Sequence, residues 1–267
     1  MKKYYCFLKL RFAAGIQYRM ASVTALTTQL IWGLMECLAY KAIAEASGGN
    51  LPMNYSSIVS YIWLKEALLA LCNTWAADND LFAMITNGDI AYELCRPVSI
   101  YSMWLSRTVG ARIAEAVMRC IPVLLCAFLM PKAYRMSLPI NGASFLLFLL
   151  TLFLALGITV TFCMIVYMLC FFTLSPQGWR MVLTGAVEFL SGNLIPLPFF
   201  PKKYLFLVEM SPFAYMQNVP FRIYSGDLAG GEMYQCIFKQ IFWLAALMFF
   251  GIVLWKQAEK RIVIQGG

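Results

Sequence analysis

The chain has 267 residues, of which 61% are hydrophobic and only 13% are charged, whereas soluble domains are about 45–50% apolar and about 25% charged. This composition excludes a water-soluble fold, because such a fold could not bury so much apolar surface. The formal net charge of +8 does not indicate nucleic-acid binding, because the basic residues cluster at the termini beside apolar runs, as the positive-inside rule describes. We therefore expect a membrane protein that contacts lipid and binds no nucleic acid.

Missing residues exclude several kinds of chemistry. The chain contains no histidine, so it cannot form a histidine metal site or a Ser-His-Asp triad. Its nine cysteines include no CxxC pair, and Cys163 and Cys170 share a helix face, as packing residues do. The chain also lacks the GxxxxGKS/T motif that binds ATP. We expect no catalytic residue, no metal and no cofactor in this chain, and we predict that it is not itself an enzyme.

Residues 1–19 are the first predicted element. A helix here places Tyr4, Leu8 and Phe12 on one side and lysines on another, which is how a helix that lies in the head-group plane is built. The alternative is a cytoplasmic extension of the first membrane span.

Six apolar runs of membrane length predict an all-α polytopic fold with a single domain over residues 1–267. The predicted spans are 20–44, 56–76, 105–130, 141–170, 178–197 and 235–256. Six crossings place both termini on one side of the membrane. The segments on that side carry eleven Lys and Arg residues, and the segments on the opposite side carry five. The positive-inside rule therefore predicts that both termini are cytoplasmic.

The longest polar passage between two spans lies within the predicted cytoplasmic loop 77–104. We expect Leu81, Met84 and Ile85 on one side of a short helix, which ends at an Asn-Gly pair suited to a left-handed turn. A second short turn follows, and together the two form a compact, half-apolar hook that suits helix-in-groove binding of a partner. The alternative is an ordinary loop that lies on lipid. The candidate contact residues are Met84, Ile85, Asn87, Gly88, Asp89, Ile90, Leu94, Arg96 and Pro97.

Residues 192–232 are too long for a simple loop and too apolar and aromatic to lie in water. Their five prolines forbid one continuous helix. We expect one short helix from Pro201 through Met210 and another between Pro212 and Gly226. These outer re-entrant helices are predicted to cover the mouth of a pathway, and a surface loop without a gating role is the alternative. The candidate gate residues are Pro196, Pro201, Pro212, Phe213 and Pro220.

Charged residues inside membrane spans are costly, so they are candidates for function. Glu36 in the first span and Lys65 in the second lie at similar depth, so they can pair if these spans are antiparallel neighbours, either as a structural ion pair or as a cargo contact. The third span carries a charged triplet on one face, which we expect to be satisfied internally and to serve either helix pairing or transport. The intramembrane charges are Glu36, Lys65, Glu66, Arg112, Glu115, Arg119 and Glu188.

Two passages of the chain resemble a known family. The first follows the I-x-x-G-x-I-x-x-x-L-x-R-P-V pattern of bacterial type-2 ATP-binding-cassette (ABC-2) permeases, in the branch with paired permease genes, through Ile85, Gly88, Asp89, Ile90, Leu94, Arg96, Pro97 and Val98. The second is similar to that family's stretch between its fifth and sixth spans, through Gly192, Pro196, Phe200, Pro201, Pro212, Phe213, Pro220 and Gly226.

The resemblance implies half of an exporter for an amphipathic or hydrophobic substrate such as a peptide, a drug or a lipid-like molecule. It implies that two copies of a separate ATPase subunit, which hold ATP and Mg, dock on the hook, and that a second permease chain, identical or paralogous, completes the pathway. The resemblance assigns no role to Lys65 and Glu66. An ion-coupled secondary transporter that uses Glu36, Lys65 and Glu188, and a membrane scaffold or immunity protein without transport activity, are the alternatives.

Overall fold

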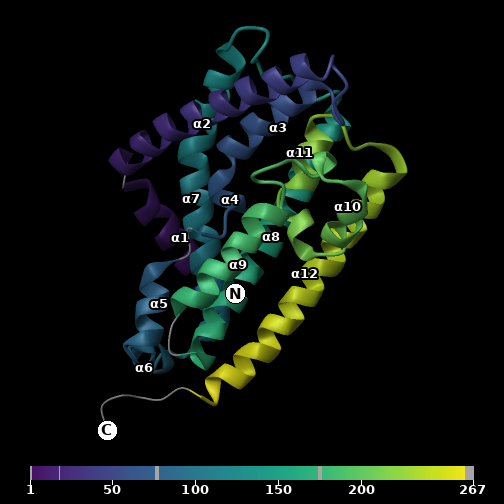
Figure 1. Ribbon diagram of the computed structural model, residues 1–267. Helices are drawn as coiled ribbons and strands as arrows, with labels where there is room; N and C mark the ends of the chain where they lie inside the picture. Colours follow the sequence, from purple (N-terminus) through teal and green to yellow (C-terminus); the bar gives the residue numbers. More distant parts are fainter. Residues whose placement is uncertain (1, 18, 76–77, 174–175, 262–267) are drawn as a thin grey trace.

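The computed structural model describes residues 2–17, 19–75, 78–173 and 176–261, and every regular element in these ranges is a helix (Figure 1). This confirms the predicted all-α class. Residues 1, 18 and 77, which belong to the predicted segments 1–19 and 77–104, lie outside the described ranges.

The chain order of the helices is α1 (Lys2–Gln17), α2 (Arg19–Ala46), α3 (Tyr55–Ala67), α4 (Leu69–Cys72), α5 (Asn79–Thr86), α6 (Ile90–Leu94), α7 (Ile100–Leu129), α8 (Gly142–Leu169), η1 (Cys170–Phe172), α9 (Pro176–Leu190), η2 (Leu197–Phe199), α10 (Lys202–Glu209), η3 (Pro212–Tyr215), α11 (Asn218–Tyr224) and α12 (Gly230–Glu259), where η marks a 3₁₀-helix.

Among the described residues, two helical segments are both long enough and apolar enough to cross a membrane. These are Gly142–Phe172, which joins α8 to η1, and Gly230–Glu259, which is α12. The helices α2 and α7 have 28 and 30 residues, so their lengths would also suffice, but charged side chains interrupt both. Six crossings therefore remain a prediction.

Two predicted spans are wrong in their extent. The second span, 56–76, breaks at Leu68 into α3 and the four-residue α4. The fifth span, 178–197, ends with α9 at Leu190, and its 15 residues reach only about 22 Å at 1.5 Å per residue. The chain turns at Gly192, whose φ is +85°. A Cβ atom at this position would lie 2.7 Å from the Tyr61 hydroxyl, so the close approach also requires glycine.

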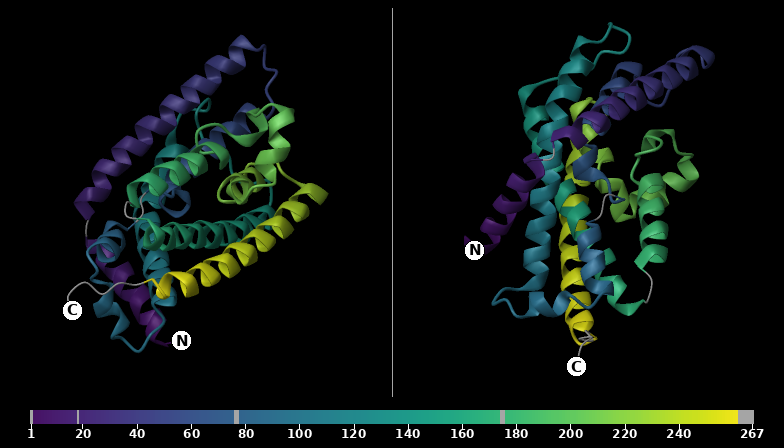
Figure 2. Two further views of the ribbon diagram at one scale, coloured as in Figure 1. Left: turned by 60° about the horizontal axis from the view of Figure 1, so that its bottom comes forward. Right: turned by 90° about the vertical axis from the view of Figure 1, so that its left-hand side faces the viewer.

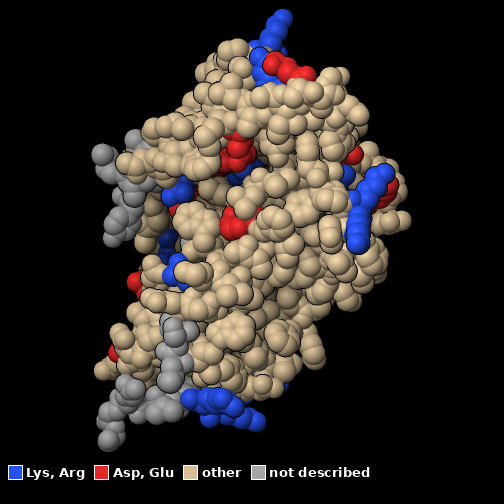
Figure 3. Space-filling view, in the orientation of Figure 1, with Lys and Arg blue, Asp and Glu red and all other residues tan. Residues whose placement is uncertain are grey.

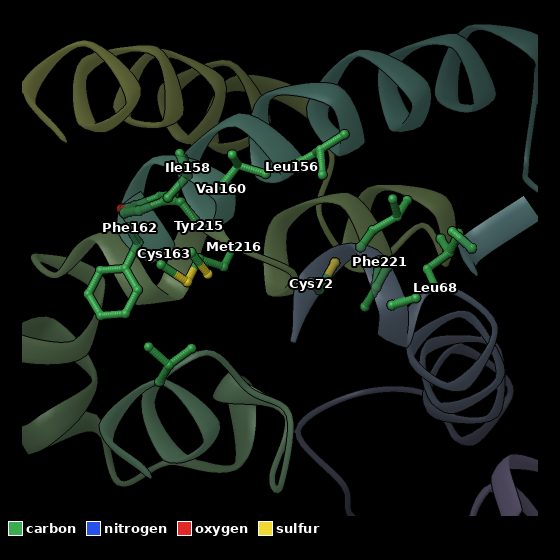
Figure 4. Close-up of a cluster of buried hydrophobic side chains, with 14 of the residues drawn as sticks. Leu68, Cys72, Leu156, Ile158, Val160, Phe162, Cys163, Tyr215, Met216 and Phe221 are labelled. Atoms are coloured by element: carbon green, nitrogen blue, oxygen red, sulfur yellow. The ribbon is translucent and has the colours of Figure 1, made fainter. Parts of the chain in front are cut away.

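The helix α8 occupies the centre of the bundle, where α4, α7, α9, α11 and α12 pack against it (Figure 1). It is apolar on all sides. Its C-terminal half is buried among these neighbours, whereas Leu146 and Phe153 in its N-terminal half are 67% and 71% exposed. Its buried threonines donate their hydroxyl protons to carbonyls one turn earlier, such as Thr159 to Ala155 at 2.9 Å. Figure 4 shows side chains of α8, including Phe162 and Cys163, beside Tyr215 and Met216 from the segment after α10.

The helix α1 packs against α7. The contact depends on Gly110 of α7, where a Cβ atom would lie 2.6 Å from the carbonyl oxygen of Leu8. Tyr4, Leu8 and Phe12 are half-buried and Lys9 is exposed, as predicted, but Tyr5 and Leu10 are also exposed. The apolar side covers protein, and the prediction that this helix lies in the head-group plane is untested.

The hook lies at the opposite end of the molecule from two of the connections between long helices. In Figure 1, α5, α6 and the C-terminal end of α12 share the lower end, while the connections from α2 to α3 and from α7 to α8 lie at the top. The start of α1 belongs to the hook end, because Lys3 donates to the carbonyl of Pro97 at 2.8 Å. In Figure 2, α2 crosses the other long helices obliquely.

Candidate functional site

The predicted hook is built from two short helices. Asp78 caps α5 by accepting a hydrogen bond from the Asp80 backbone N–H at 3.1 Å, and Asn87 is the C-cap residue. Gly88 has a φ of +79°, a left-handed conformation that allows the sharp turn into α6. Leu81 is buried in the protein core, and Met84 and Ile85 pack against that core. The predicted local structure of the hook is therefore confirmed.

The exposed surface of the hook includes only part of the predicted contact set. Five of the nine residues are exposed, namely Asn87, Asp89, Leu94, Arg96 and Pro97, whereas Met84, Ile85 and Gly88 are half-buried. Ile90 is 2% exposed, so it anchors α6 and could only support a contact made by its exposed neighbours. Sequence reasoning missed Tyr92, which is 76% exposed. The sequence does contain a signal for it. Tyr92 is an aromatic residue in a polar loop, and Tyr is enriched among the residues that contribute most to binding energy at interfaces.

Three arginines from three different helices meet at the N-terminal end of α5. Arg107 of α7 donates to Asp78 at 2.7 Å and to Asp80 at 2.9 Å. Arg11 of α1 lies 3.6 Å from the Asp80 carboxylate, and Arg180 of α9 donates to the Asn79 side chain at 2.7 Å. We call this set the arginine clamp. It fastens α5 to α1, α7 and α9, and sequence reasoning missed it because its members are far apart in the chain.

The charged triplet of α7 does not close on itself as predicted. Arg119 pairs with Glu115, but Arg112 turns away from both and is buried. Its Nη1 donates to the carbonyls of Ala70, Leu71 and Asn73 at 3.1, 3.3 and 2.6 Å. The last carbonyls of a helix have no partner within it, so Arg112 satisfies the end of α4. The predicted three-residue cluster is wrong in this respect.

A second charged group lies between α2, α3 and the turn after α9. Lys65 pairs with Glu36, as predicted, and lies 3.4 Å from the Glu66 carboxylate. It also donates to the carbonyl of Asn193 at 3.1 Å, and the Asn193 side chain donates to Glu188. Glu188, whose partner the sequence did not indicate, thus joins this cluster through Asn193. Figure 3 shows acidic and basic side chains close together near the middle of a largely uncharged face.

The segment 192–232 forms short helices, but it packs into the bundle. The predicted helix over 201–210 is confirmed as α10. The helix predicted between Pro212 and Gly226 is divided into η3 and α11, and α11 packs against α3 and α8. Of the predicted gate residues, Pro196 and Pro220 are buried, Phe213 and Pro212 are half-buried, and Pro201 is exposed. Phe213 contacts Phe162 of α8 edge to face, with ring centroids 5.4 Å apart.

These features define a helical membrane protein in which Lys65, Glu66 and Arg112 are buried inside the bundle and a half-apolar hook projects from one end. The profile of the ABC-2 family transporter proteins matches residues 22–266. The chain belongs to this family, which confirms the resemblance seen in the hook. It is therefore the membrane permease component of an ABC transporter, and a component of this kind works with an ABC ATPase. A comparison with curated proteins found no match.

Proposed function

We propose that the chain is the permease subunit of an ATP-driven exporter that moves an amphipathic or hydrophobic substrate across the cytoplasmic membrane. The observation that carries this proposal is the arginine clamp. It joins the hook, where an ATPase would dock, to α1, α7 and α9. A push on α5 would therefore move three helices of the bundle together. An ordinary lipid-facing loop has no need of such a connection.

In this proposal the membrane is crossed six times. α3 and α4 together serve as the second crossing, and α9 with the turn at Gly192 serves as the fifth. The non-helical backbone in these two crossings packs against neighbouring helices, as such backbone must at membrane depth. Both termini and the hook are cytoplasmic, and α10 and α11 belong to the outer half. No step of ATP hydrolysis takes place in this chain, so ATP and Mg bind to the partner.

A second permease chain and two ATPase subunits complete the proposed transporter. The oblique helix α2 supports the presence of a second permease chain. It exposes a row of large apolar side chains, with Ile31 61% and Trp32 52% exposed. A second permease, identical or paralogous, would bury such a face. One ATPase would bind each hook, with Tyr92 as the central contact and with Asp89 and Arg96 on the polar edge.

The test is capture of the ATPase by the tagged permease in mild detergent. We expect the captured chain to hydrolyse ATP, and Tyr92→Ala to reduce capture at least 10-fold, because central aromatic contacts are worth about 2 kcal/mol or more. Tyr204→Ala is the matched control, because Tyr204 is 54% exposed in α10, away from the hook. Cargo movement in vesicles that lack ATP would favour an ion-coupled transporter instead. Absence of any ATP-hydrolysing partner would contradict the proposal.

A further inference from the structure

A groove of about 740 Å³ lies beside the hook and outside the sites described so far. Its walls are formed by the first turns of α7, the last turns of α12, Tyr4 of α1 and Leu94 of α6. We call it the hook-side groove. Its volume is within the range of about 300–1,000 Å³ that is usual for small-molecule sites.

The groove changes from apolar to polar along its length. On α12, Met248, Ile252 and Trp255 line it first, and Lys256 and Glu259 line it nearer the end of the helix. On α7 the lining mixes apolar and hydroxyl side chains, with Leu105 between Ser102 and Ser106, so the gradient is carried by α12. An apolar inner part and a polar mouth at the boundary of a membrane helix match the two parts of a phospholipid molecule.

The lining of the polar mouth holds one basic and one acidic side chain, Lys256 and Glu259, and two further lysines lie next to lining residues. Lys256 is exposed, and the described residues give it no ion-pair partner. Lys3 lies beside the mouth, bonded to the carbonyl of Pro97, and Lys260 follows directly after Glu259. Glu259 is the one acidic side chain that lines the groove. Basic pockets between membrane helices at the cytoplasmic side bind anionic head groups.

Two polar features of the groove wall favour a head group. The N-cap residue of α7, Ser99, makes no side-chain cap, and its backbone N–H donates to the Tyr4 hydroxyl at 3.2 Å. The N-terminal ends of helices attract phosphate. The Tyr101 hydroxyl is buried and has no hydrogen-bond partner among the described residues. It lies against Gly251 of α12, between the two walls.

We propose that the hook-side groove binds one anionic phospholipid from the leaflet on the hook side. The phosphate lies between Lys256 and the start of α7, and the upper acyl chains lie along Met248, Ile252 and Trp255. The lipid thus fills the space between the hook, α7 and α12. This inference requires that the chain spans a membrane and does not depend on the ATPase or on the cargo.

The test uses quenching of tryptophan fluorescence by brominated lipids. The protein is placed in phosphatidylcholine nanodiscs that contain a small fraction of brominated phosphatidylglycerol or of brominated phosphatidylcholine. The signal of Trp255 is the difference between the protein and its Trp255→Phe variant. We expect phosphatidylglycerol to quench this signal at roughly one fifth of the concentration that phosphatidylcholine needs, since one basic side chain near the surface is worth about 1 kcal/mol.

Charge variants separate a head-group site from unspecific lipid contact. Lys256→Gln should abolish the preference for phosphatidylglycerol, and Glu259→Gln should increase it. Lys239→Gln is the control, because Lys239 is an exposed lysine of α12 that does not line the groove. Equal quenching by the two lipids in the unaltered protein would overturn the proposal. Failure of both lipids to quench Trp255 would also overturn it, and would indicate that protein fills the groove.

Discussion

Lys65 is enclosed by three acceptors in the part of the chain that the sequence assigns to the membrane interior. It contacts Glu36, Glu66 and the carbonyl of Asn193, and its side chain is only 4% exposed. Two carboxylates beside one ammonium group leave an excess of negative charge. The Lys65 ammonium group is the cationic partner that the two carboxylates share.

Lys65→Met should destabilise the protein strongly, because removing one member of a buried ion pair costs about 3–5 kcal/mol. For a chain of this size we expect the thermal midpoint in detergent to fall by roughly 10 °C. Adding Glu36→Gln should restore part of the loss, because one fewer carboxylate is then left without a partner. Lys41→Met is the control, since Lys41 and Glu45 form a largely exposed pair at 3.9 Å, and an equal loss in both single variants would contradict the argument.

Arg107 makes two contacts of the arginine clamp, to Asp78 at 2.7 Å and to Asp80 at 2.9 Å. Hydrogen bonds to charged groups are worth about 1.5–3 kcal/mol, so Arg107→Gln should loosen α5 and raise the rate of amide hydrogen exchange in residues 79–86 by roughly 10-fold or more. Arg135→Gln is the matched control, because Arg135 is exposed at the opposite end of the bundle. Unchanged exchange in α5 would mean that the clamp does not hold the hook.

At the scale of helices, sequence reasoning succeeded where a local signal fixes the element. The Asn-Gly pair ended α5 and Pro201 began α10, as expected from backbone rules. It failed where the ending depends on distant residues. The second predicted span ends early, where Arg112 binds the last carbonyls of α4, and the fifth ends where Tyr61 approaches Gly192. Apolar runs continue through both places, so hydropathy carries no sign of them. Glu36 and Lys65 were paired correctly, because consecutive antiparallel spans bring them together. The arginine clamp was not found, because its members come from helices that are far apart in the chain.

The packing of α1 on α7 gives a prediction at this scale. Gly110→Ala should destabilise the contact by about 1–3 kcal/mol, which is the usual cost of overpacking, because the new methyl group meets the backbone of Leu8. Gly185→Ala is the control, since it also lies within a helix but has open space around it. There alanine should stabilise α9 by up to about 1 kcal/mol. Thermal midpoints of the two variants that move in the same direction would contradict this packing.

The whole molecule has two ends that are built from different elements. The hook end holds α5, α6, the start of α1 and the end of α12, and the opposite end holds the connections at 47–54 and 130–141. A coupling role requires the hook end to face the cytoplasm, where ATP is available. The proposed function therefore depends on the orientation of the whole molecule in the membrane, with the hook end towards the cytoplasm.

The native cysteines allow this orientation to be measured. Among the described residues, only Cys6 and Cys95 are exposed thiols, so a Cys6→Ser variant leaves Cys95 in the hook as the principal target for a membrane-impermeant maleimide. We expect labelling of Cys95 in inside-out vesicles and little in right-side-out vesicles. In a Cys6→Ser, Cys95→Ser background, Ser47→Cys in the connection from α2 to α3 should show the reverse pattern. Labelling of Cys95 from the outside would place the hook away from ATP, and the arginine clamp would then need a function other than coupling.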